Sequence, residues 1–170
     1  MKLLITILHF LAQKFQLLLM SETLPLNDRL YEVAFSFLGR EATPNDEVED
    51  ALACVHTLST IISLSFSELR FPILFSTKDL YRHLKNSPSW KQVDLPQHGD
   101  VILCVTGTGN DSVSNGHCGV VGKRQAEDMS VWIMSNDSRN GLWSANYSLT
   151  SWQRYFGSKG GYISHFFRRV

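Results

Sequence analysis

The first clear pattern along the chain is an apolar stripe at helical spacing over residues 27–38. Its members are Leu30, Val33, Ala34, Phe37 and Leu38. Residues three and four positions apart share one face of a helix, so this segment is predicted to be helical and to end at Gly39. A second stripe begins near residue 51 and places Cys54 early in another helix; its members are Ala51, Cys54, Val55, Leu58, Ile61 and Ile62. Four acids between residues 46 and 50 suit the first turn of this helix, because carboxylates are favourable at a helix N-terminus.

Further along, the pattern changes from helical spacing to short β-type runs. A brief helix over 79–84, capped by Thr77, precedes predicted strands at 90–95, 101–105, 118–121, 131–134 and 162–167. Gly, Asn and Ser dominate the loop 107–116, and a Trp- and Tyr-rich helix is predicted around 149–156. Because helices come first and strands second, the chain is predicted to have an α+β fold with an antiparallel sheet.

The N-terminal segment, residues 1–24, differs from the rest of the chain. It is rich in Leu, Ile and Phe, but its unbroken apolar run is too short to span a bilayer. Polar residues at helical spacing within it favour an amphipathic helix that packs on its own domain or makes peripheral contact with a membrane surface. A signal peptide is the alternative, although no convincing cleavage site follows. The main domain is predicted to comprise residues 25–170.

Composition narrows the classes of function. The 170 residues suit one domain, and 16 basic and 16 acidic side chains cancel, so no long-range field favours a nucleic-acid partner. Three scattered cysteines do not form a disulfide framework, and no CxxC or HExxH motif suggests a metal site. We therefore predict no metal and no nucleic-acid partner, and we expect the chain to be a monomer.

Cys54 and His117 are the candidate catalytic residues. A thiol attacks an acyl carbon as thiolate, and a helix N-terminus or a neighbouring histidine lowers its pKa. Cys54 is predicted near a helix start, while His117 follows a polar loop and begins a strand between two glycines. The adjacent Cys118 is expected to point to the opposite, far face of that strand. An ordinary buried cysteine and a structural histidine are the competing interpretations.

A third residue is needed to hold the imidazole in one tautomer. Asn136 is the first candidate and Asp137 the second, because both follow the predicted strand 131–134, which should pair with the His117 strand. Their composition is equally that of a simple turn. The aromatic stretch from Trp143 to Trp152, which includes Asn146 and Tyr147, is suited either to contact with a sugar or peptide or to closing the core.

These segments together resemble a known family. Cys54 on a helix, Gly99-Asp100-Val101-Ile102 before a strand, Gly116-His117-Cys118-Gly119-Val120-Val121-Gly122, and Ile133-Met134-Ser135-Asn136 look like the papain-like NlpC/P60 and CHAP amidohydrolases. The resemblance covers about residues 28–170. It implies a papain-like fold in which the Cys helix packs on an antiparallel sheet.

The resemblance also implies an activity. Cys54 would be the nucleophile, His117 the base and Asn136 the orienting residue of a cysteine peptidase or amidase that cleaves amide bonds of cell-wall peptidoglycan without a cofactor. Such a hydrolase acts at the cell wall, as a phage-encoded endolysin or an exported remodelling enzyme. Two alternatives stay open: a non-catalytic wall-binding or virion structural module with the same fold, and a membrane-associated acyltransferase that uses the same Cys and His.

Overall fold

The computed structural model describes residues 24–42, 53–110 and 115–170. The predicted N-terminal helix and the acidic turn at 46–50 therefore lie outside the described residues. Within the described part, none of the helices combines the length and apolar character needed to cross a membrane.

Four α-helices occur in the described residues, and three of them come before the sheet, as predicted. They are α2 (Leu26–Ser36), α3 (Ala53–Ser65), α4 (Thr77–Asn86) and the short α5 (Leu149–Trp152), with a 3-10 turn, η2 (Ser67–Leu69), after α3. The chain of α5 continues as a π-helical segment, η3 (Gln153–Lys159). The helix predicted at 79–84 is longer at both ends, and its cap is Ser76 rather than Thr77, because the Ser76 hydroxyl accepts from the backbone N–H of Asp79.

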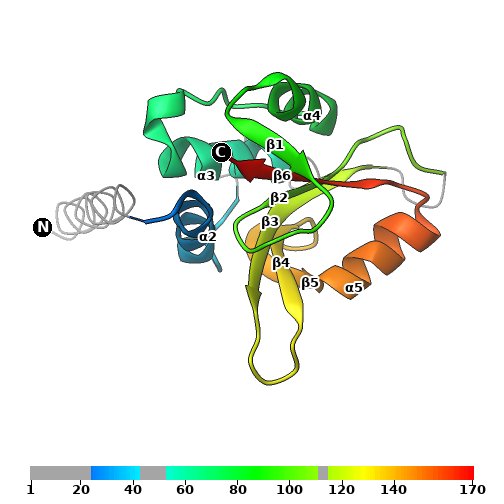
Figure 1. Ribbon diagram of the computed structural model, residues 1–170. Coiled ribbons are helices and arrows are strands. Elements are labelled where there is room, and N and C mark those ends of the chain that lie inside the picture. The colour runs from blue at the N-terminus through cyan, green and yellow to red at the C-terminus, as the bar shows by residue number, and fades with distance from the viewer. Residues whose placement is uncertain (1–23, 43–52, 111–114) are drawn as a thin grey trace, which may run out of the picture.

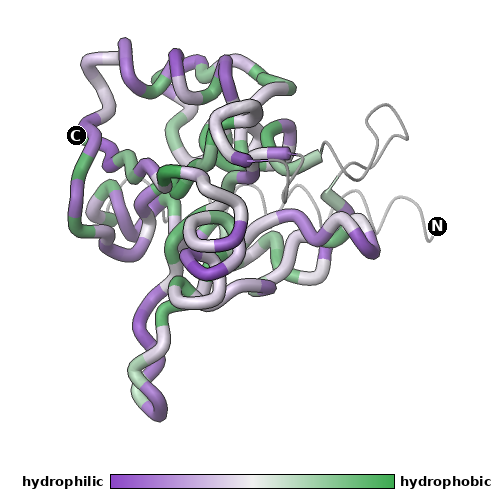
Figure 2. The backbone as a smooth tube through the Cα atoms, turned by 90° about the vertical axis from the view of Figure 1, so that its right-hand side faces the viewer, coloured by the Kyte–Doolittle hydropathy of each residue, from purple (hydrophilic) through white to green (hydrophobic). Residues whose placement is uncertain are grey.

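Six strands form one antiparallel sheet, which confirms the α+β class. They are β1 (Trp90–Val93), β2 (Val101–Cys104), β3 (His117–Arg124), β4 (Val131–Asp137), β5 (Leu142–Ser148) and β6 (Ser164–Arg169), in the order β1-β6-β2-β3-β4-β5. Sequence patterning missed β5, although Trp143, Ala145 and Tyr147 alternate there with polar residues, because this aromatic stretch was interpreted only as a source of substrate or core contacts. The hairpin between β3 and β4 projects from the body, and the tube view shows it as largely hydrophilic (Figure 2).

Helices cover both faces of the sheet (Figure 1). On one face, α2, α3 and α4 bury a large core; on the other, α5 and η3 cover a smaller one. Side chains of β3 and β4 alternate between the two cores. Cys118, Val120 and Met134 belong to the first, whereas Val121 and Ile133 belong to the second.

The Gly99-Asp100 motif fixes the start of β2 in place; its contacts do not involve the candidate catalytic residues. Asp100 is fully buried and pairs with Arg168, with Nε–Oδ1 and Nη2–Oδ2 distances of 2.9 and 2.8 Å. The Asn27 amide and the Gln97 backbone N–H also donate to its carboxylate. Gly99 has φ +77°, and a Cβ there would lie 1.9 Å from the backbone oxygen of Asn27, so only glycine fits. The motif therefore ties α2, β2 and β6 together.

Candidate active site

Cys54 lies in the first turn of the described part of α3, where this helix meets the end of the sheet. Apolar packing of Val55, Leu58 and Ile62 against the sheet fixes the helix in place. Cys54 is 5% exposed and opens into a cavity of about 210 Å³. Thr106, which follows β2, and Gly116, which precedes β3, also line this cavity. The thiol is therefore nearly buried but faces a space at the end of the two central strands.

The pKa of the Cys54 thiol is lowered well below its ordinary value. The largest cause is a hydrogen bond with the Cys118 side chain, and the charge of His117 and a hydrogen bond with its imidazole act in the same direction. Burial raises the pKa, but by less than these contacts lower it. The thiolate is the form that attacks acyl carbons, so these contacts prepare Cys54 as a nucleophile.

The two other cysteines behave in the opposite way. Burial raises the pKa of Cys104 to about 11, and burial together with the neighbouring Cys54 raises that of Cys118. Both are fully buried. Among the three thiols, the structure therefore favours Cys54 alone as a thiolate. Cys118 points to the face of β3 opposite His117, as expected, but that face packs against α3, so Cys118 lies in the same core as Cys54.

His117 begins β3 and is held by contacts on the α5 side of the sheet. Its ring stacks on Trp152 and Phe156, with centroid distances of 5.5 and 5.6 Å. Its Nε2 lies 3.1 Å from the Ser135 hydroxyl. The same imidazole is one of the groups that act on the Cys54 thiol, so the ring links the thiol to β4.

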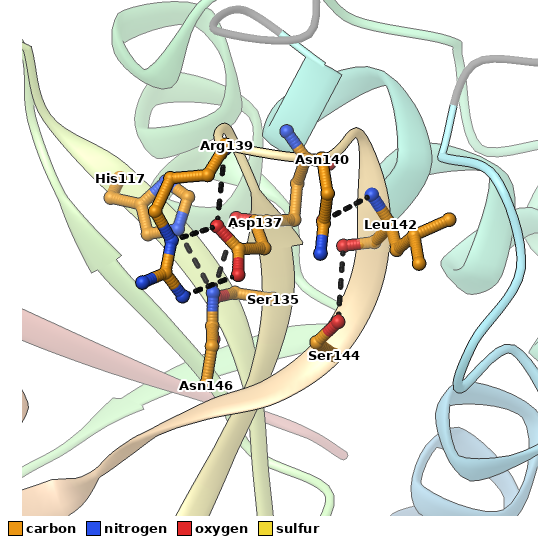
Figure 3. A network of polar contacts seen from close by, with 9 residues as sticks. His117, Ser135, Asp137, Arg139, Asn140, Leu142, Ser144 and Asn146 are labelled. Carbon is orange, nitrogen blue, oxygen red and sulfur yellow. Dashed lines mark hydrogen bonds and ion pairs between the residues drawn. The ribbon is translucent and has the colours of Figure 1, made fainter.

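Behind Ser135 the polar network continues into β5 (Figure 3). The Ser135 hydroxyl donates to Asn146 Oδ1 at 2.7 Å. The Asn146 amide nitrogen in turn lies 3.4 Å from the backbone oxygen of Asn136. Ser135 is fully buried, so its hydroxyl depends on these protein partners.

Asp137 lies at the end of β4, near His117 and beside Arg139 (Figure 3). Two hydrogen bonds from the Arg139 guanidinium, at 2.6 and 2.9 Å, lower the pKa of the Asp137 carboxyl, and the charge of His117 adds a smaller effect in the same direction. The Asp137 side chain is 9% exposed, whereas that of Arg139 is 82% exposed. Asp137 therefore supplies a negative charge close to the imidazole, while its carboxylate accepts hydrogen bonds from Arg139.

Gly116, directly before His117, is fixed by a close backbone approach and by two threonines. A Cβ on Gly116 would lie 2.1 Å from the backbone oxygen of Cys104, so glycine is required for this approach. The Gly116 N–H donates to the Thr106 hydroxyl at 3.0 Å, and Thr77 at the start of α4 hydrogen-bonds both the hydroxyl and the N–H of Thr106. These contacts set where β3 begins and thus where His117 lies.

The structure brings Cys54, His117 and Asp137 together, but it places Asn136 differently. Because β4 extends to Asp137, Asn136 is a strand residue that alternates to the α3 side, away from the Ser135 and Asp137 face. The His117 Nε2 contact goes to Ser135. The sequence analysis ended this strand at Met134, so that Ser135 fell in a turn, and it left Asn146 open between contact with a substrate and closing of the core. If the predicted strand had been extended past Met134, the alternation of Ile133, Ser135 and Asp137 would have placed Ser135 on the same face as His117.

The aromatic stretch 143–152 contributes to packing at both of its ends. Trp143 and Trp152 are fully buried, in the first and second core respectively. This supports the core-closing interpretation for these two residues. No group of three or more side chains of the kinds that bind metals occurs within the described residues.

Comparison with known proteins identified no relative: no protein-family model matches the chain, and no curated protein matches it.

Proposed function

We propose that the protein is a cysteine hydrolase of papain-like architecture that cleaves amide bonds in the peptide part of cell-wall peptidoglycan. The observation that carries the proposal is the position of Cys54, which lines the cavity at the end of the sheet beside Gly116, the residue before His117. The contacts with Cys118 and His117, which lower the pKa of the Cys54 thiol, support it. The Cys-bearing helix packed on an antiparallel sheet that carries the histidine supports the papain-like arrangement.

The reaction follows from the two residues. The Cys54 thiolate attacks the amide carbonyl carbon and forms a C–S bond. As the C–N bond breaks, the His117 imidazolium gives its proton to the leaving nitrogen. Water then attacks the thioester while His117 takes a proton from it, the C–S bond breaks, and Cys54 returns as thiolate beside a protonated His117. The products are an amine and a carboxylic acid.

The charge distribution supports a substrate that carries carboxylates. Residues 138–170 contain five Lys and Arg and no Asp or Glu, although the whole chain is neutral. A surface hollow of about 530 Å³ lies in this region and includes two of these cations. It is lined by Asn146, Tyr147, Ser151, Arg154, Tyr155 and Lys159. The Tyr147 ring lies 6.1 Å from that of His117, so a peptide held there is next to the imidazole. Peptides with free carboxylates, such as those of peptidoglycan, match this lining.

Clearing of purified cell walls tests the proposal. The wild-type chain should reduce turbidity and release new amine and carboxyl termini, which mass spectrometry of the fragments locates. Cys54→Ala should abolish clearing, whereas Cys104→Ala, which also removes one buried thiol, should retain it if the variant remains folded. Clearing by Cys54→Ala at the wild-type rate would overturn the mechanism. Binding to walls without any cleavage by the wild type would indicate a non-catalytic module instead.

A further inference from the structure

A series of hydrogen bonds runs from His117 through Ser135 and Asn146 to the backbone oxygen of Asn136. This last oxygen determines which atom donates and which accepts at each step. The backbone oxygen of Asn136 can only accept, so the Asn146 group that faces it at 3.4 Å is the amide nitrogen. This fixes the orientation of the Asn146 side chain and places its oxygen toward Ser135. The O···O distance of 2.7 Å there is typical of a good hydrogen bond.

The same reasoning assigns the donor and the acceptor between Ser135 and the imidazole. Asn146 Oδ1 carries no proton, so the single hydroxyl proton of Ser135 is used in the bond to it. Toward His117 the same hydroxyl oxygen can then only accept, at 3.1 Å from Nε2. The proton of the neutral ring therefore lies on Nε2, and Nδ1 keeps the lone pair.

We propose that Ser135 and Asn146 are the positioning residues of the site, and that together they hold neutral His117 as the Nε2–H tautomer with Nδ1 facing Cys54. This proposal deepens the cysteine hydrolase mechanism and rests on it for the catalytic consequence. The pair takes the role expected of Asn136 or Asp137, with the difference that a hydroxyl stands between the imidazole and the amide. Neither residue touches the reacting atoms.

The aromatic contacts of His117 support the assignment. Trp152 and Phe156 lie nearly parallel to its ring, at 23° and 19°, so they limit tilting but equally fit the ring after a 180° rotation about its Cβ–Cγ bond. An in-plane hydrogen bond at Nε2 is the contact that stops this rotation. Ser135, on the neighbouring strand, supplies it.

The tautomer can be measured without substrate. In the full chain with Cys54→Ala, ¹⁵N NMR at a pH where the ring is neutral should show His117 protonated at Nε2 and unprotonated at Nδ1. Free histidine also favours this tautomer, so the discriminating comparison is the double variant with Asn146→Leu. Removal of the acceptor frees the Ser135 proton to donate to Nε2, and the Nδ1–H form should increase. Ser144→Ala, which removes a polar group from the same strand as Asn146, should leave the tautomer unchanged.

Kinetics provides the second measurement. Ser135→Ala should lower kcat by about 10- to 100-fold with little change in KM, a loss comparable to that of the outer hydrogen-bond partner of a metal-bound histidine. Ser135→Thr, which keeps a hydroxyl, should recover part of the rate.

The two measurements separate the two proposals. A dominant Nδ1–H form in the Cys54→Ala protein, or an unchanged tautomer in a folded Asn146→Leu variant, overturns the positioning role whatever the activity. A tautomer that responds as expected in a chain that cleaves no wall supports the positioning role and counts against the hydrolase.

Discussion

Selective alkylation of Cys54 is the most direct consequence of the site geometry. A thiol with a pKa of about 11, as for Cys104, is about one part in 10⁴ thiolate at pH 7. A thiol at the ordinary value of 9.0 is about one part in 100, and Cys54 lies well below that value. The thiolate fraction of Cys54 should therefore exceed that of Cys104 by more than about 100-fold at neutral pH.

The assay is brief labelling of the native protein with iodoacetamide between pH 5 and 9, followed by peptide mass spectrometry. Cys54 should be labelled first. Because its pKa is lowered, labelling should persist as the pH falls below 8 and disappear only below that lowered pKa. His117→Ala removes two of the contacts that lower the pKa, so the labelling curve should move to higher pH. In denaturant all three thiols should react alike, which controls for the chemistry of detection. Slow and uniform labelling of the folded chain would refute the reasoning.

Two further predictions concern the frame of the site and the hollow beside it. Arg168→Met leaves the buried Asp100 carboxylate without its ion pair, so unfolding free energy should fall by about 3 kcal/mol. At about 2–4 °C per kcal/mol, calorimetry should detect a Tm lower by roughly 6–12 °C; an unchanged Tm would show that the pair does not stabilise the fold. Arg154→Gln combined with Lys159→Gln should weaken binding of a carboxylate-bearing wall peptide to the Cys54→Ala chain, as measured by calorimetry, and leave binding of the corresponding peptide amide nearly unchanged. Equal losses for the two peptides would contradict an anion-binding role.

The parts of the fold that sequence predicted are those with a clear apolar period. The stripe that includes Leu30 and Val33 predicted α2, and the stripe that includes Val55 and Leu58 predicted α3, because each stripe has one large core to pack against. Strands β2 and β3 were recognised from runs of β-branched residues. The strand β5 was missed although Ser144 and Asn146 alternate with Trp143, Ala145 and Tyr147, which is the period-two pattern of a half-buried strand.

The third residue of the site was hard to predict because its polar neighbours look like a turn. Ser135-Asn136-Asp137-Ser138 has the composition of a loop, and so β4 was expected to end at Met134. The strand continues because its polar groups are satisfied: Ser135 by His117 and Asn146 on the neighbouring strands, and Asp137 by the nearby Arg139. His117 is far from Ser135 in sequence, and Asn146 lies on the strand that was missed. Composition therefore indicated a turn where the fold uses a polar strand end.

That both His117 and Cys118 act on Cys54 could also be recognised only from the structure. Adjacent strand residues point to opposite faces, and that rule led to the expectation that only His117 serves the thiol. Cys54 instead lies at the end of the sheet, where β3 begins, so a thiol on one face and an imidazole on the other both reach it. The hydrogen bond with Cys118 is the largest influence on the acidity of Cys54, whereas His117 adds a charge and a proton acceptor. Cys118 thus stabilises the thiolate, and His117, held through Ser135 and Asn146, is left to move the proton during the reaction.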